Sequence, residues 1–455
     1  MRRRAFLFFA AFVVYNLNLR PIPAGDTAPA ALMPFAIAGD HTMTFDRYAS
    51  WYRQSQHMSP NWFRRLGDGH YYSSYPVALP LLLTPFYAPM VVPLDVQHMP
   101  VDQVVLLARI CEKVSASLVA AVSVAAFLAL AEKLTNRRAA LWLTVVYALG
   151  SETWAISSQA LWQHGASELA VILGLLCLVR AAEQPGRTLP AVSAGLCAGL
   201  AVAVRLSNVI FLLVTGGYVL LSRWDRARKA AFSAAAMVFP AATLAYNLVL
   251  FAGPSGGYTG ARLYNGNLLR GVSGLLFSPS RGLLVFSPIF ILSVLGVFLW
   301  FRGRRPPRPE IYWICLLVAA LEIPAIGQLR VWHGGFSYGP RLLTDIVPCL
   351  VILLIPVMDL VERSLPWRLA FGGLLLLSIS VQAIGAFCYP NGHWDALPVS
   401  VDRHRERIWD WRDNQIFRSA AAGPVLDPYY LAWGFLTGHG SAGAKTLEER
   451  GIKLW

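Results

Sequence analysis

Gly25-Asp26-Thr27-Ala28-Pro29 follows the first apolar run of this chain, which extends from Ala5 to about Tyr15. It stands near the start of a polar stretch, residues 20–103, in a sequence that is otherwise mostly apolar. A carboxylate a few residues outside a bilayer, followed by many aromatic residues and arginines, is suited to chemistry on a lipid-borne substrate. We therefore interpret the rest of the chain as a membrane scaffold around this loop.

The composition indicates a polytopic membrane protein. Of 455 residues, 56% are hydrophobic and only 14% are charged, and the mean hydropathy is +0.49. These values are too apolar for a soluble protein of ordinary composition. The net charge of +14 comes from short basic clusters between apolar runs, a pattern that argues against a nucleic-acid partner. The six cysteines show no metal-ligand spacing, so we expect no disulfide framework and no structural zinc.

The apolar runs predict an all-α fold. About eleven of them are long enough to cross a hydrocarbon core of roughly 30 Å. They lie near residues 5–19, 104–132, 139–157, 164–181, 188–205, 206–222, 230–251, 282–301, 311–329, 341–361 and 368–388.

The distribution of Lys and Arg predicts the orientation, because short cytoplasmic loops hold an excess of both. Starting with Arg2 to Arg4 inside, alternate connections carry the basic clusters, and no signal-peptidase site follows the first run. We expect an uncleaved multi-pass protein of the cell (inner) membrane with a cytoplasmic N-terminus. Residues 1–388 would form the transmembrane domain and residues 389–455 a small extracytoplasmic cap. The other outer segments would be residues 20–103, about 252–281 and 330–340.

The first outer loop contains two candidate membrane-surface elements. Phe45 to Arg65 mixes aromatic residues with arginines, as an amphipathic helix on the headgroups does. Tyr75 to Pro85 is apolar but interrupted by prolines, so we expect a re-entrant or interfacial segment rather than a span.

Asp26 is the leading catalytic candidate. A carboxylate at this depth can deprotonate an acceptor hydroxyl that attacks an activated sugar. Glycosidases need a second carboxyl group to protonate the leaving alcohol, whereas a sugar on a lipid phosphate has a leaving group that is stable as an anion. The alternative is that Asp26 caps a turn or a helix beginning near Pro29.

A second constellation is Trp332-His333-Gly334-Gly335-Phe336-Ser337-Tyr338-Gly339-Pro340-Arg341. A glycine-rich outer loop brings the Arg341 guanidinium to the end of a span, where it can bind a phosphate bidentately. Asp345, at position i+4, is expected to hold Arg341 in place. Arg281 stands at the mouth of another span. Both arginines have the alternative role of interfacial anchors.

Further polar residues stand at the outer ends of apolar runs. Trp162-Gln163-His164-Gly165, with Glu168, has side chains that can face a sugar, although a lone helix-start histidine is more often structural. Ionisable residues at membrane depth are functional candidates by default. Here Arg109, Glu112, Lys113 and Glu322 fit a structural role equally well.

Together these motifs resemble the GT-C glycosyltransferases. The stretches that carry the resemblance are Gly25 to Pro29, Tyr71-Tyr72-Ser73-Ser74-Tyr75-Pro76, Trp162 to Gly165, Arg281-Gly282-Leu283-Leu284 and Trp332 to Arg341. The nearest branch is similar to the bacterial relatives of protein O-mannosyltransferases and of the aminoarabinose transferase. The resemblance covers residues 1 to about 388. It implies an inverting transfer of a hexosyl or pentosyl group from a polyprenyl-phosphate donor to a glycan, lipid or protein acceptor on the outer face.

The resemblance also implies roles for individual residues. Asp26 matches the catalytic base, and Arg341, Arg281 and Lys113 are placed to bind the donor phosphate. The sugar and acceptor pockets would be formed by Tyr75, Trp162, His164, Trp332, His333 and Tyr338. Thr27 stands where the O-mannosyltransferases have a second acidic residue, and an acidic metal motif like that of the oligosaccharyltransferases is not found. We therefore expect no cofactor, with a divalent metal left open.

Two other functions fit a membrane protein with charged outer loops. A flippase or transporter of a lipid-linked sugar would need charged groups around a cavity, but transporters usually have related halves and sites near the midplane. A non-catalytic assembly protein would leave Asp26 and Arg341 as anchors only.

Overall fold

The computed structural model describes residues 2–18, 20–22, 24–54, 62–91, 93–257 and 264–424, and the end of the predicted cap, 425–455, lies outside them. Within these ranges the regular secondary structure is helical except for one two-stranded sheet. The division into residues 1–388 and a cap stays a prediction.

Five helices are long and apolar enough to cross a membrane: α5 (Val101–Leu134), α7 (Gln163–Glu183), α10 (Arg226–Phe251), α14 (Pro309–Gly327) and α17 (Leu365–Cys388). A sixth span results if Arg341–Ile352 and α16 (Ile355–Arg363), bent by 53°, are counted together. Arg341–Ile352 comprises η6 (Arg341–Ile346) and α15 (Val347–Ile352). The chain is therefore a multi-pass membrane protein.

The remaining predicted spans are shorter helices, so the number eleven stays a prediction. They are α1 (Arg2–Asn16), α6 (Arg137–Leu149), α8 (Leu189–Val204), η3 (Leu206–Asn208) with α9 (Val209–Leu221), and α13 (Ile291–Phe301). The expected span 282–301 is divided into α12 (Leu283–Phe286), η5 (Pro288–Phe290) and α13, because Pro288 lacks the N–H that would continue a helix. A π-helical turn, η2 (Thr153–Ser157), follows α6.

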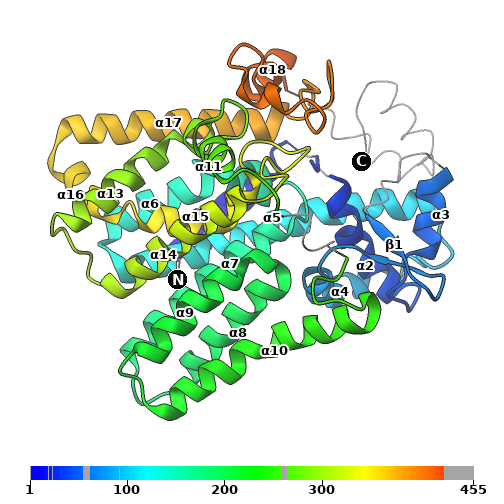
Figure 1. Ribbon diagram of the computed structural model, residues 1–455, viewed down its shortest axis with the longest axis horizontal. Helices are drawn as coiled ribbons and strands as arrows, with labels where there is room; N and C mark the ends of the chain where they lie inside the picture. Colours follow the sequence, from blue (N-terminus) through cyan, green and yellow to red (C-terminus); the bar gives the residue numbers. More distant parts are fainter. Residues whose placement is uncertain are drawn as a thin grey trace.

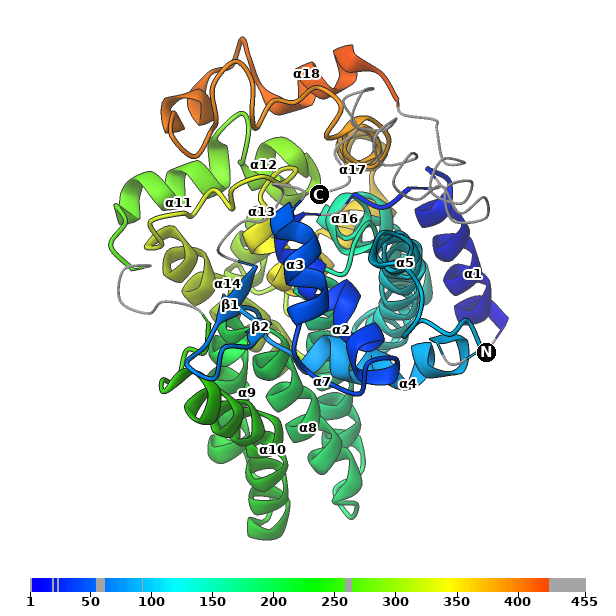
Figure 2. The ribbon, with the colours of Figure 1, turned by 90° about the vertical axis from the view of Figure 1, so that its right-hand side faces the viewer.

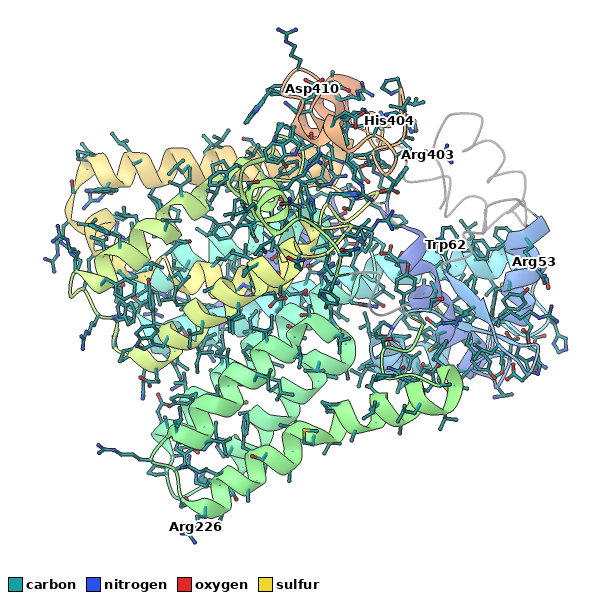
Figure 3. The ribbon with its side chains drawn as sticks, viewed as in Figure 1. Arg53, Trp62, Arg226, Arg403, His404 and Asp410 are labelled. Carbon is teal, nitrogen blue, oxygen red and sulfur yellow. The ribbon has the colours of Figure 1, made fainter. Side chains whose placement is uncertain are left out.

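The long helices run between two ends of the molecule. In Figure 1, α5 and α17 cross the view, and α8, α9 and α10 form a group below them. Figure 3 places Arg226, at the start of α10, at the opposite end from Arg53 and Trp62 of the first loop. A basic connection and the polar loop thus lie at different ends of the helices, as alternation requires. The cytoplasmic placement of the N-terminus stays a prediction.

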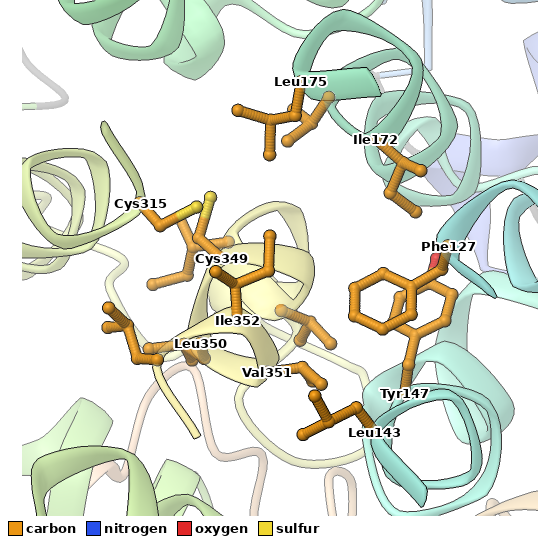
Figure 4. Packing of buried hydrophobic residues seen from close by; sticks show 14 of the residues in the cluster. Phe127, Leu143, Tyr147, Ile172, Leu175, Cys315, Cys349, Leu350, Val351 and Ile352 are labelled. Atoms are coloured by element: carbon orange, nitrogen blue, oxygen red, sulfur yellow. The ribbon is translucent and has the colours of Figure 1, made fainter. Parts of the chain in front are cut away.

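The core joins helices from both halves of the chain. Phe127 of α5 stacks on Tyr147 of α6, with ring centroids 4.8 Å apart. In Figure 4 these rings face Val351 and Ile352 of α15, with Ile172 of α7 close by. All five residues are buried. The bent segment that begins at Arg341 is therefore fixed in the centre of the helical bundle.

The first loop folds into a small unit with its own apolar core. It contains η1 (Gly25–Thr27), α2 (Ala28–Ala38), α3 (Asp46–Gln54), the antiparallel strands β1 (Phe63–Arg65) and β2 (Tyr71–Ser73), and α4 (Ala78–Val91). The core of this unit includes Val104, Val105 and Ala108 of α5. The loop is thereby attached to the longest helix of the chain.

One expectation for this loop differs from the structure. The interfacial helix predicted to reach Arg65 ends at Gln54, residues 55–61 lie outside the described ranges, and Phe63–Arg65 is a strand. Phe63 is buried among aromatic rings while Arg64 and Arg65 are exposed, and successive side chains such as Phe63 and Arg64 point to opposite faces of a strand. The backbone of this strand pairs with β2. The proline-containing segment forms one helix, α4, through Pro85 and Pro89, and α4 is too short to be counted among the spans. Its placement as a re-entrant or interfacial segment stays a prediction.

The C-terminal segment lies over the ends of α17 and α11 (Leu268–Phe277), as Figure 2 shows. It contains η7 (Arg405–Trp409) and α18 (Gln415–Ala422). Trp394 is buried, and its indole N–H donates a hydrogen bond to the Asp413 carbonyl at 2.7 Å. This segment packs directly on the residues that precede Arg341.

Candidate active site

Asp26 lies in η1, directly before α2. The N-cap of α2 is Thr27, and no side chain caps that helix, so Asp26 does not have the capping role considered as its alternative. The Thr27 hydroxyl donates to the Ala24 carbonyl at 3.0 Å and closes the turn. The Asp26 side chain keeps 24% of its surface exposed. Its carboxylate is therefore free to contact groups outside its own turn.

Arg341 is the partner of Asp26. Its Nη1 donates to Asp26 Oδ2 at 2.7 Å, and its Nη2 donates to the Gly334 carbonyl at 2.6 Å. The guanidinium carbon stands 4.1 Å from the centre of the Trp162 ring, a cation–π contact. Residues from the first loop, the start of α7 and the start of η6 thus meet at one point.

The expectation that Asp345 holds Arg341 is wrong. The chain forms a 3-10 helix from Arg341 to Ile346, which has three residues per turn, so the residue that returns to Arg341 is Thr344. Asp345 is buried and contacts His164 Nδ1 at 3.2 Å. Its second oxygen pairs with Arg205, a residue that we did not single out in the sequence.

The three side chains predicted to bind phosphate differ in whether an N–H group is left without an acceptor from the protein. All three protons of the Lys113 ammonium group have acceptors, on Tyr15, Ser158 and Gln159, at 2.7 to 3.2 Å. Arg341 Nε, by contrast, is buried without a hydrogen-bond partner.

Arg281 also has no free donor. It is fully buried, and its five N–H groups have five acceptors on Ser280, His333, Gly335, Asp395 and Gln415. The structure brings Arg341 together with Asp26 and places Arg281 and Lys113 in contacts of their own.

Arg109 and Glu112 form a buried ion pair that contacts residues next to Asp26 and next to Trp162. Arg109 donates to Glu112 at 2.7 Å and to the Thr27 hydroxyl at 3.4 Å. The other oxygen of Glu112 accepts the Leu161 N–H at 3.1 Å. The pair therefore links α5 to the residues beside Asp26 and beside Trp162, which fits the structural interpretation of this cluster.

The other predicted pocket residues have different surroundings. The Tyr338 hydroxyl donates to the Val381 carbonyl at 2.8 Å, and its ring packs between Phe286 and Tyr389. Trp332 is buried against Gly274. Tyr75 follows β2 and is half-buried.

His333 is a neutral imidazole in this structure. Burial is the main cause that lowers its pKa to about 3, and the charges of Arg281, Arg405 and Arg341 lower it further. Its Nδ1 accepts the Gly335 N–H at 3.2 Å, so its proton is on Nε2. Nε2 has no hydrogen-bond partner, and the nearest acidic oxygen, on Asp402, is 3.9 Å away.

Several polar residues near the site were missed in the sequence, among them Arg205, Asp395 and Gln415. Asp395 and Gln415 are buried in the segment after α17, where no motif marks them. Buried Glu322, which was considered, has no hydrogen-bond partner on either carboxylate oxygen. Among the described residues, no group of three or more His, Cys, Asp or Glu side chains is placed to hold a metal ion.

Comparison with protein-family models and with curated proteins found no match. Among solved structures, the chain is similar to ArnT from Cupriavidus metallidurans, which was solved bound to undecaprenyl phosphate. The TM-score is 0.52, the sequence identity is 15%, and the match covers 98% of this chain and 73% of that chain. At this identity the likeness concerns the fold alone, and it confirms the GT-C-like fold that the motifs predicted.

Proposed function

We propose that this protein is an inverting membrane glycosyltransferase that uses a polyprenyl-phosphate sugar donor. The observation that carries the proposal is the 2.7 Å contact between Asp26 and Arg341 beside Trp162. It puts a partly exposed carboxylate next to a guanidinium that still has an unused N–H. The similar structure contains undecaprenyl phosphate, which is the type of lipid that such a donor would release.

In the proposed reaction the acceptor hydroxyl attacks the anomeric carbon of the sugar and gives its proton to Asp26. The bond between the anomeric carbon and the phosphate oxygen breaks, and its electron pair leaves with the polyprenyl phosphate. Attack opposite the departing phosphate inverts the anomeric configuration. Arg341 stabilises the negative charge that develops on the phosphate, so no acid is needed for the leaving group.

The surrounding residues position these groups. Trp162 stacks against the Arg341 guanidinium. His333 would line the sugar or acceptor pocket, and its buried Nε2–H, which has no protein partner, would be available as a neutral donor. Arg281 and Lys113 keep the walls of the site in place, because their donors are already occupied by the protein. Residues 1–388 would carry out the transfer in the cell membrane, and residues 389–455 would cover its outer end.

The test uses purified protein in nanodiscs, a panel of radiolabelled polyprenyl-phosphate sugars and membrane extract as the acceptor. Asp26→Asn preserves shape but removes the base, so we expect transfer to fall by about 10²–10⁴-fold while donor binding is retained. Arg341→Gln should weaken donor binding as well. Full transfer activity in both variants would contradict the assignment. Movement of lipid-linked sugar across a sealed bilayer without transfer would instead support a flippase.

A further inference from the structure

The loop from His333 to Gly339, which delivers Arg341, has little rigidity of its own. Gly334, Gly335 and Gly339 have φ values of 77°, 66° and 59°, in the left-handed region that glycine adopts without strain. Glycine also loses the most conformational freedom on ordering. A loop with three such residues needs outside contacts to place the next side chain accurately.

Two side chains from other segments supply these contacts. Arg281 donates to the carbonyls of His333 at 2.8 Å and Gly335 at 2.9 Å. Gln415 donates to the carbonyl of Ser337 at 2.8 Å and accepts the N–H of Gly339 at 3.0 Å. The carbonyl between the first two, on Gly334, turns the other way and accepts from Arg341.

The two side chains are joined to each other and to a carboxylate. Arg281 Nη1 donates to Gln415 Oε1 at 2.7 Å, and Arg281 Nη2 pairs with Asp395 Oδ1 at 2.6 Å. Gln415 Nε2 lies 3.3 Å from both oxygens of Asp395. All three residues are buried. A buried charge network of this kind is stable only when every member has its partners.

Asp395 and Gln415 are themselves held by the C-terminal segment. The guanidinium carbons of Arg281 and Arg407 lie 5.1 and 4.9 Å from the centre of the neighbouring Trp394 ring, which makes cation–π contacts with both. Asn414 caps α18 by accepting the Phe417 N–H at 2.9 Å, which fixes the first residue of that helix, Gln415. The position of the loop therefore depends on a part of the chain far from it in sequence.

We infer that Arg281, Asp395 and Gln415 form a loop clamp through which the C-terminal segment positions Arg341. They are positioning residues, since they act on the site only through the backbone of residues 333–339. The consequence for donor binding rests on the proposed function of Arg341, whereas the ordering of the loop does not.

The test compares Gln415→Ala and Asp395→Asn with wild-type protein. Glu406→Gln is the matched control, because Glu406 lies in the same segment, is exposed, and pairs with His404 rather than with the loop or with Arg407. Amide hydrogen exchange of residues 333–339 should become at least about tenfold faster in the first two variants and stay unchanged in the control. Unchanged exchange in Gln415→Ala and Asp395→Asn would overturn the inference.

Binding of undecaprenyl phosphate in detergent, followed by tryptophan fluorescence, tests the link to Arg341. We expect about tenfold weaker binding in Gln415→Ala and wild-type affinity in Glu406→Gln. Equal binding by wild type and Gln415→Ala would overturn the effect on Arg341. No binding even by wild type would contradict the proposed function, and hydrogen exchange would then decide the clamp by itself.

If either variant unfolds, Arg281→Lys provides a second test. Lysine keeps the charge opposite Asp395 but has three donors in place of five. It should loosen the loop with a smaller loss of thermal stability. A folded Arg281→Lys variant with wild-type exchange in residues 333–339 would also overturn the inference.

Discussion

Replacing Gly25 by alanine should displace Asp26 because Trp62 fills the space where a side chain would go. A Cβ atom on Gly25 would lie 1.8 Å from Trp62 Cε2, and ordinary contact begins at 3.4 Å. The ring or the turn must therefore move by about 1.6 Å, the difference between these two distances. Movement of the ring is opposed on one side by Tyr52, which it meets edge-on with ring centroids 5.7 Å apart.

The size of this shift sets the expected effects. Overpacking of this kind costs about 1–3 kcal/mol of stability. A displacement of about 1 Å in a catalytic group can lower the rate about 10²-fold. We expect Gly25→Ala to remain folded, with a modestly lower melting temperature, and to lose about 10²-fold in sugar transfer.

The control and the rescue lie in the same loop. A Cβ atom on Gly67 would meet nothing within 4 Å, so Gly67→Ala should behave as wild type. Adding Trp62→Leu to Gly25→Ala removes the clash and should recover part of the transfer activity. If Gly25→Ala transfers sugar as fast as Gly67→Ala, the inference that the contact between Gly25 and Trp62 sets the position of Asp26 is wrong.

Three further predictions concern the groups around the site. Arg341→Lys keeps the charge but loses the planar fork and the stacking on Trp162, so donor affinity measured by titration should fall about tenfold. Wild-type stability should decrease by up to about 2 kcal/mol from pH 7 to pH 5, because unfolded histidine takes up a proton near pH 6.5 while the pKa of buried His333 is about 3. In His333→Gln the stability, measured by thermal melting, should decrease less between pH 7 and pH 5. If it decreases as much as in wild type, His333 is not the cause. Asp345→Asn removes the buried carboxylate that contacts His164 and the partly exposed Arg205, and should lower the free energy of unfolding by about 1–3 kcal/mol. A melting curve identical to that of wild type would contradict this prediction.

The sequence predicted the membrane scaffold well where an apolar run forms one unbroken helix. The runs of α5, α7, α10, α14 and α17 were located from hydropathy alone, because burial of backbone hydrogen bonds in a bilayer forces a long apolar stretch into a helix. It did not predict the breaks. The interruption before Pro288 follows from the missing N–H of that proline, which was not used in locating the runs, and the bend of 53° lies between Ile352 and Ile355.

The sequence indicated that the site residues come together only through the membrane topology, and not through any local sequence motif. Asp26, Trp162 and Arg341 were each placed at the outer end of an apolar run, and groups on one side of a membrane have a restricted space in which to meet. The pairing itself was not predictable, since the i+4 rule favoured Asp345 for Arg341 and failed where the helix is 3-10. Arg205 was not predicted as a site residue because it stands between two apolar runs with almost no loop.

Arg281 and Arg341 show why a sequence motif does not settle what an arginine does. Both precede an apolar helical run in an outer turn, and both were expected to bind phosphate. Arg281 has five N–H groups and five protein acceptors, so a phosphate would have to displace a buried contact at a cost that its own charge would not offset. Arg341 keeps a buried Nε without an acceptor and a side chain that is 11% exposed. The acceptors that make this difference come from residues 280 to 415, which only the tertiary structure brings together. They support the proposals that Arg281 holds the loop and that Arg341 binds the donor.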